Sequence, residues 1–134
     1  MISEGVVILG GETQGLGILR QLSRSGVPGV VVDQDRLGAA MVSRHCRKYF
    51  QSPPYAQTGR FVDFLITLGR RHDFHGWTLF LTDDEQVRVV SQYARELSEL
   101  YRISIPSWET LQIVYEKKRF HDFARQHGLD VPQT

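Results

Sequence analysis

The stretch GVVILGGETQGLG, residues 5–17, decides the fold because it joins a continuous apolar run to a glycine-rich turn and the start of a helix. An apolar run bounded by glycines is typical of a strand buried on both faces of a parallel sheet. Leu16, Leu19 and Leu22 then recur at helical spacing, and the run VVVD at residues 30–33 predicts a second buried strand. Together these elements form a predicted βαβ unit with a right-handed crossover.

Beyond this unit, strands and helices continue to alternate. The patterns predict a short helix over 37–43 and strands over 48–51, 77–82 and 102–105. Between the first two of these strands they predict a helix with Thr58 as candidate cap and one apolar face made by Phe61, Phe64, Leu65 and Leu68. After the strand over 77–82 they predict one helix, capped by Asp83 or Asp84, whose sheet-facing residues are Val87, Val90, Ala94 and Leu97. Two helices are predicted after Pro106. The expected fold is α/β: a three-layer, Rossmann-like open sheet, mostly parallel, with helices on both faces.

The composition is that of one ordinary globular domain, since 41% of the 134 residues are hydrophobic and 23% are charged. Sixteen basic and fifteen acidic residues leave a formal charge of +1, so no global field attracts nucleic acid.

The longest apolar runs fall far short of the roughly 20 residues that span a bilayer, and no basic leader precedes the first strand. The single cysteine, Cys46, fits a reducing compartment, and we expect a cytoplasmic protein.

The glycine-rich turn at residues 10–17 lies where a parallel sheet opens its ligand crevice. Its glycines permit positive φ and leave amide N–H groups at a helix N-terminus suited to anions, although a close-packed turn without a ligand accounts for the same residues. The spacing is not G-x-G-x-x-G, because Arg20 occupies the third glycine position. A P-loop is excluded too, because no Lys-Ser or Lys-Thr follows the glycines.

The spacing of Gly11, Gly15 and Gly17 does match the glycine pattern of short-chain dehydrogenases, and Asp33 ends the second strand where a ribose-binding acid would lie. The Tyr-x-x-x-Lys pair that those enzymes need is absent from the sequence. Asp33 is equally well explained as a solvated residue that closes a strand. An NAD(P)-binding Rossmann module of an oxidoreductase therefore stays an alternative.

Residues 108–134 resemble the entry to the ATP-binding core of ATP-grasp ligases. They contain a short helix, the acid–Lys pair Glu116-Lys117, an amphipathic helix, the motif Gly-apolar-x-Val-Pro over 128–132, and then Thr134. Three earlier stretches, VILGG with GLG, VVD at 31–33 and TDDE at 82–85, look like the pre-ATP-grasp domain that precedes this core. The resemblance spans essentially the whole chain. It is closest to the carboxylate–amine ligase and carbamoyl-phosphate-synthase-like branch, among ligases that act on amino-acid or peptide carboxylates.

The resemblance implies that residues 1–106 are a Rossmann-like pre-ATP-grasp domain and that residues 107–134 are a helical segment leading into an ATP-grasp core outside this sequence. It assigns Lys117 to the ATP phosphates, with a one-residue ambiguity toward Lys118, while Glu116 stands where the family more often has Asp. It assigns to substrate binding the residues Gly10, Gly11, Glu12, Thr13, Gly15, Asp33, Asp84 and Glu85. Acids at the carboxyl end of a strand also cap the following helix, so both roles stay open for Asp84 and Glu85.

The activity implied by the resemblance is phosphorylation of a carboxylate to an acyl phosphate, which an amine then attacks. The implied cofactors are ATP and Mg²⁺, held mostly by the core, so these residues alone are not expected to catalyse and no catalytic residue is assigned. The implied partners are ATP, a small carboxylate such as an amino acid or a peptide, the ATP-grasp core and, as an open option, a second copy in a homodimer. Neither nucleic acid nor a membrane is expected.

No metal site is predicted within the sequence, because His72 and His75 have no third ligand in view. The remaining alternative is a noncatalytic binding domain that kept the fold and lost the core.

Overall fold

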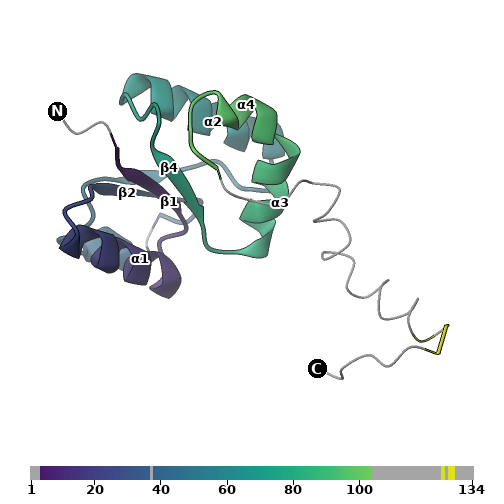
Figure 1. The fold of residues 1–134 in the computed structure, drawn as a ribbon, viewed down its shortest axis with the longest axis horizontal. Helices are drawn as coiled ribbons and strands as arrows, with labels where there is room; N and C mark the ends of the chain where they lie inside the picture. Colours follow the sequence, from purple (N-terminus) through teal and green to yellow (C-terminus); the bar gives the residue numbers. More distant parts are fainter. Residues whose placement is uncertain (1–3, 37, 104–124, 126, 129–134) are drawn as a thin grey trace. The chain divides into compact units, whose positions relative to one another are not determined.

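The computed structural model describes residues 4–36, 38–103, 125 and 127–128. The chain divides into two compact units, Met1–Ser104 and Ile105–Thr134. The elements of the first unit are β1 (Val6–Leu9), α1 (Thr13–Arg24), β2 (Gly29–Asp33), the 3₁₀ helix η1 (Ala39–Val42), β3 (Tyr49–Gln51), α2 (Thr58–Arg71), β4 (Thr78–Leu81), α3 (Asp84–Gln92) and α4 (Ala94–Ser98) (Figure 1). The two helices predicted after Pro106 lie almost wholly outside the described residues.

The four described strands form one parallel sheet in the order β3-β2-β1-β4. β1 pairs with β2 on one side and with β4 on the other, so that Leu9 lies opposite both Val32 and Leu81. This register brings the carboxyl ends of the three strands level. Because the chain moves from β1 outward to β3 and then crosses back to β4, the strand order reverses beside β1, where open α/β sheets bind ligands. The predicted α/β class with a parallel sheet is confirmed.

Both faces of the central strand are buried, as its continuous apolar run predicts. Val7, Ile8 and Leu9 have no exposed surface. On one face Ile8 belongs to a core cluster with Val31 of β2 and Leu19 of α1. Figure 1 shows α1 on one side of the sheet and α2 with α4 on the other. Burying one such side chain contributes about 1.5–3 kcal/mol, so β1 and the residues packed against it are a large contribution to the stability of the domain.

The helix predicted after the fourth strand is present, but it is not one continuous element. Asp83 is the N-cap of α3, because its side chain accepts a hydrogen bond from the N–H of Gln86 over 2.9 Å. This confirms one of the two predicted caps. α3 ends at Gln92, however, and α4 begins at Ala94, so the prediction of a single helix is wrong.

The inward face of these two helices also differs from the predicted one. Val90 and Leu97 are buried, as predicted, and Val89 is buried beside them. Val87 and Ala94, the other two residues predicted to face the sheet, are only half-buried. The reason is that Gln86 occupies the inward position of the first turn, so that the next inward positions fall three and four residues later.

Two element boundaries differ from those predicted. Thr58 is the first residue of α2 rather than its cap, and its hydroxyl donates to the backbone carbonyl of Tyr55 over 3.4 Å. Gln57 stands at the N-cap position without a capping hydrogen bond from its side chain. At the other edge of the sheet, Arg102 forms a single parallel bridge with Thr78, and the rest of the predicted strand over 102–105 falls largely outside the described residues.

Gly15 is packed so closely against the turn after β1 that a Cβ there would overlap the carbonyl oxygen of Gly10. We expect Gly15→Ala to lower the free energy of unfolding by about 1–3 kcal/mol, the usual effect of overpacking. Gly17 is the matched control, because it lies in the same helix and nothing lies within 4 Å of its Cβ position. Gly17→Ala should raise the free energy of unfolding by about 0.5–1 kcal/mol. Urea unfolding followed by circular dichroism measures both, and equal effects would contradict the close packing of Gly15.

Candidate functional site

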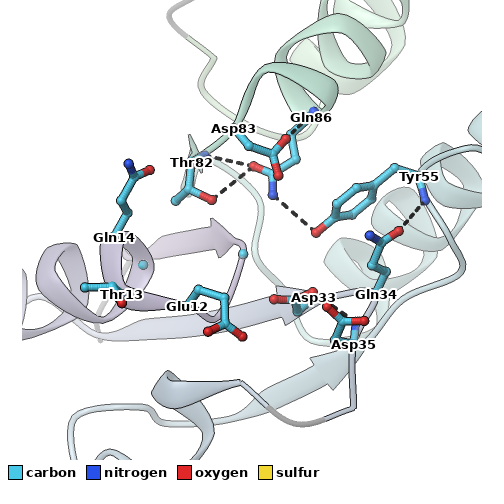
Figure 2. Close-up of a pocket in the computed structure, with 12 residues that line it drawn as sticks. Glu12, Thr13, Gln14, Asp33, Gln34, Asp35, Tyr55, Thr82, Asp83 and Gln86 are labelled. Carbon is cyan, nitrogen blue, oxygen red and sulfur yellow. Dashed lines mark hydrogen bonds between the residues drawn. The ribbon is translucent and has the colours of Figure 1, made fainter.

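A pocket of about 280 Å³ lies at the carboxyl edge of the sheet, where the loops after β1, β2 and β4 meet (Figure 2). Its lining residues are Gly10, Glu12, Thr13, Gln14, Gly15, Asp33, Gln34, Asp35, Tyr55, Thr82, Asp83 and Gln86. Tyr55 comes from the loop between β3 and α2, and the others come from the strand ends and the helix starts that follow them. The pocket therefore coincides with the reversal in strand order.

The buried carboxylate of Asp33 fastens the glycine-rich loop to the end of β2. Its Oδ2 accepts a hydrogen bond from the N–H of Gly11 over 2.6 Å, and its Oδ1 accepts one from the N–H of Asp35 over 2.9 Å. The carbonyl of Gly11 accepts in turn from the N–H of Ala40 over 2.8 Å, so this part of the loop is held on both sides. Gly10 turns the chain at a φ of 103°, which favours glycine. Because Asp33 is only 4% exposed, the alternative of a solvated residue is wrong.

A chain of hydrogen bonds joins the end of β4 to Tyr55 along another side of the pocket (Figure 2). The N–H of Thr82 donates to the side-chain carbonyl oxygen of Gln86 over 2.8 Å, and its hydroxyl donates to the backbone carbonyl of Leu9 over 2.7 Å. The amide nitrogen of Gln86 donates to the hydroxyl oxygen of Tyr55 over 3.2 Å. Gln86 is 1% exposed and Tyr55 is 2% exposed, so these polar side chains are buried with the core.

Carboxylates dominate the electrostatics of the pocket. Glu12, Asp33, Asp35 and Asp83 line it, and the described lining residues include no Lys, Arg or His. Tyr49, whose hydroxyl donates to the backbone carbonyl of Asp35 over 2.8 Å, responds to the same charges. Burial, followed by the charges of Asp33, Asp35 and Glu12, raises the pKa of Tyr49 to about 12. The pocket is therefore an environment for a cationic group.

The structure brings most of the residues predicted to bind substrate to this one place. Gly10, Glu12, Thr13, Gly15 and Asp33 line the pocket, and Gly11 is hydrogen-bonded to Asp33 at its edge. Asp84 and Glu85 are exposed in the first turn of α3 and are not among the lining residues. Asp83 lies there instead, because it is the N-cap residue between the end of β4 and the first turn of α3. Lys117, predicted to contact ATP, lies outside the described residues.

The predicted substrate-binding residues did not include the lining residues Gln14, Gln34, Asp35, Tyr55, Thr82 and Gln86. The acidic loop that contains Asp83 was predicted to face the substrate. The rule that ligands bind beyond the carboxyl ends of parallel strands could have found Asp35 and Thr82. Tyr55 and Gln86 carry no local signal, because each is recognisable only from its hydrogen bond to the other, 31 residues away.

Among the described residues, no group of three or more His, Cys, Asp or Glu side chains is placed to hold a metal ion. No helix in that part of the chain is long and apolar enough to cross a bilayer. The chain matches no protein-family model, and no curated protein is significantly similar to it in sequence.

Replacing the Asp33 carboxylate by an amide should loosen the loop that it holds. Asp33→Asn keeps one acceptor oxygen but turns an N–H donor toward a backbone N–H, so we expect the free energy of unfolding to fall by about 1–3 kcal/mol. Asp35→Asn is the matched control, because Asp35 is exposed and its carboxylate accepts no hydrogen bond within the described structure. Its effect should stay within about 0.5 kcal/mol. Chemical denaturation of the two variants checks the difference, which would vanish if Asp33 were only a pocket-lining charge.

Proposed function

We propose that this chain is the N-terminal, substrate-side domain of an ATP-dependent carboxylate–amine ligase of the ATP-grasp superfamily, and that it does not catalyse alone. The observation that carries the proposal is the pocket at the carboxyl edge of the sheet, which is lined by four carboxylates and by no described cation. Such a pocket suits the ammonium group of an amino acid or a peptide. The resemblance of the glycine-rich turn, the second strand and the acidic loop to pre-ATP-grasp domains supports the same reading.

The ammonium group would be bound by carboxylates from three different loops. Glu12 follows β1, Asp35 follows β2 and Asp83 follows β4, and Figure 2 shows Asp83 across the pocket from the other two. Asp33 also lines the pocket, but its oxygens already accept from two backbone N–H groups. Each hydrogen bond between an ammonium and a carboxylate is charge-assisted and contributes about 1.5–3 kcal/mol.

A bound ammonium is protonated and has no lone pair, so it cannot be the amine that attacks the acyl phosphate. The pocket would therefore hold the amino end of the carboxylate substrate, leaving the carboxylate free to reach the ATP site. There the γ-phosphoryl group of ATP would pass to a carboxylate oxygen, releasing ADP. The attacking amine would then form the new C–N bond as the C–O bond to phosphate breaks, and it would lose a proton.

The same pocket weighs against an NAD(P)-binding module. A dinucleotide places its pyrophosphate on the amide groups of the glycine-rich loop and its ribose on the acid at the end of β2. Here the N–H of Gly11 already donates to Asp33, and the second oxygen of Asp33 accepts from Asp35. The carboxylates of Glu12 and Asp83 would also repel a pyrophosphate.

The cofactors of this proposal would lie mostly outside the described residues. ATP would be contacted by Lys117 and by the C-terminal core. The described residues do not fit a Mg²⁺ ion, because they contain no group of three or more His, Cys, Asp or Glu side chains placed to hold one. The single thiol and the need for ATP support a cytoplasmic location, where the domain would pair with its core and, as one option, with a second copy.

The ligase proposal is tested by the turnover of the complete gene product. We expect ADP release only in the presence of a carboxylate, drawn from a panel of amino acids and dipeptides, and formation of a hydroxamate when hydroxylamine traps the acyl phosphate. Lys117→Ala should raise the KM for ATP at least about tenfold, because it removes a charge-assisted contact to phosphate. Lys118→Ala is measured in parallel because of the one-residue ambiguity between the two lysines, and a rise in KM at Lys118 with none at Lys117 would move the phosphate contact by one residue. Absence of carboxylate-dependent ADP release across the whole panel would contradict the proposal and favour a noncatalytic binding domain.

The charge of the pocket can be tested on the 134-residue chain. Glycylglycine should shift NMR resonances of residues around the pocket, whereas N-acetylglycylglycine, which lacks the ammonium, should not. The double variant Glu12→Gln with Asp83→Asn should weaken glycylglycine binding at least about tenfold, since it removes two charge-assisted partners. Asparagine is as good an N-cap as aspartate, so α3 should keep its start. Equal binding of the acetylated and free peptides would rule out ammonium recognition.

A further inference from the structure

The hydrogen bonds between β4 and Tyr55 have a direction that the backbone imposes. The N–H of Thr82 can only donate, so the atom of Gln86 that faces it must be the carbonyl oxygen. The other end of the same amide is then the NH₂ group, which can only donate to Tyr55. The hydroxyl oxygen of Tyr55 is thereby assigned as an acceptor, and its proton has to point elsewhere.

The proton of Tyr55 has no acceptor among the hydrogen bonds of the described residues, although the residue is only 2% exposed. Figure 2 shows the hydroxyl group directed into the pocket, between Gln86 on one side and Asp33 on the other. Burial, and then the charge of Asp33, raises the pKa of Tyr55 well above that of a free tyrosine. The hydroxyl therefore keeps its proton at any physiological pH and presents a buried donor to whatever enters the pocket.

We propose that Tyr55 reads a neutral hydrogen-bond acceptor next to the ammonium group of the ligand, so that the pocket selects an α-amino amide, such as the first residue of a peptide, over a free amino acid. This inference rests on the ammonium site of the proposed function and adds the chemical class of the substrate. Tyr55 is here a specificity-determining residue that contacts substrate.

The charges of the pocket explain why the acceptor would be neutral. In a free amino acid the carboxylate carbon lies two bonds from the ammonium nitrogen, so the carboxylate would be carried in among Glu12, Asp33, Asp35 and Asp83. Like charges brought this close together repel each other, and the repulsion is stronger near a protein surface than in bulk water. An amide carbonyl carries no net charge and still accepts the proton of Tyr55.

The size of the pocket agrees with this assignment. Its volume of about 280 Å³ lies just under the range of about 300–1,000 Å³ that is typical of sites for drug-sized ligands. One small residue fits such a space, and the rest of a peptide would extend out of it. The distal carboxylate of that peptide would then lie away from the acidic pocket.

The test compares three ligands that share an ammonium group on the 134-residue chain, by NMR titration at constant ionic strength. The ligands are methylammonium, glycine and glycinamide. We expect glycinamide to bind at least tenfold more tightly than glycine, and more tightly than methylammonium. Because this comparison uses the unmodified chain, it does not depend on the folding of any variant.

Two tyrosine variants assign the preference to Tyr55. Tyr55→Phe should weaken glycinamide binding about fivefold to tenfold and leave methylammonium binding unchanged. Tyr101→Phe is the matched control, since Tyr101 is equally buried and its hydroxyl donates to the backbone carbonyl of Leu65 over 2.7 Å, away from the pocket. Tyr101→Phe should lose about as much stability as Tyr55→Phe, and it should keep the preference for glycinamide over glycine.

The possible results separate this inference from the function on which it rests. Binding of methylammonium without a preference for glycinamide over glycine would overturn the role of Tyr55 and leave the ammonium site standing. Tighter binding of glycine would overturn it as well, because the hydroxyl would then read a carboxylate. Failure of all three ligands to bind would overturn the ammonium site itself, whatever the ATP turnover of the complete gene product.

Discussion

The hydrogen bond from the N–H of Gly11 to the carboxylate of Asp33 is the contact on which the site depends. It joins the loop after β1 to the end of β2 over 2.6 Å, and the second oxygen of the same carboxylate fixes the following loop at Asp35. A neutral side chain could not accept both backbone donors equally well. With these two loops held, the third loop needs only to close against them, which Thr82 does through the carbonyl of Leu9.

Local patterns predicted the parts of this molecule that local chemistry determines. The run at residues 6–9 forms a strand buried on both faces, and Asp83 caps α3, because an apolar run and an aspartate before a helix act through their immediate neighbours. Thr58 was expected to cap α2 but donates backward to Tyr55 instead. That choice depends on how the loop before α2 is folded, which no helix signal encodes.

The candidate site was only partly predictable for the same reason. Its glycine-rich and β2 sides follow from the rule that ligands bind at the carboxyl ends of parallel strands. The opposite side depends on Gln86, a polar residue turned toward the core because Thr82 and Tyr55 both hydrogen-bond to it. Because Gln86 is on the buried face of α3, the neighbouring Val87 is only half-buried. A periodicity based on apolar residues counts glutamine as outward-facing and therefore misplaces the face.

The position of β4 in the sheet also determines when the pocket can exist. β1 pairs with β2 after a short crossover, but its pairing with β4 joins Val6–Leu9 to Thr78–Leu81, far along the chain. Closing this longer loop costs more chain entropy than closing the β1–β2 crossover, so we expect the β1–β4 pairing to form after the β1–β2 pairing in folding. Until then the loops that carry Glu12 and Asp35 would lack the loop of Asp83 on the other side of the pocket. Ligand binding and completion of the fold are therefore coupled in this domain, and a ligand for the pocket should speed refolding little while slowing unfolding in proportion to its affinity.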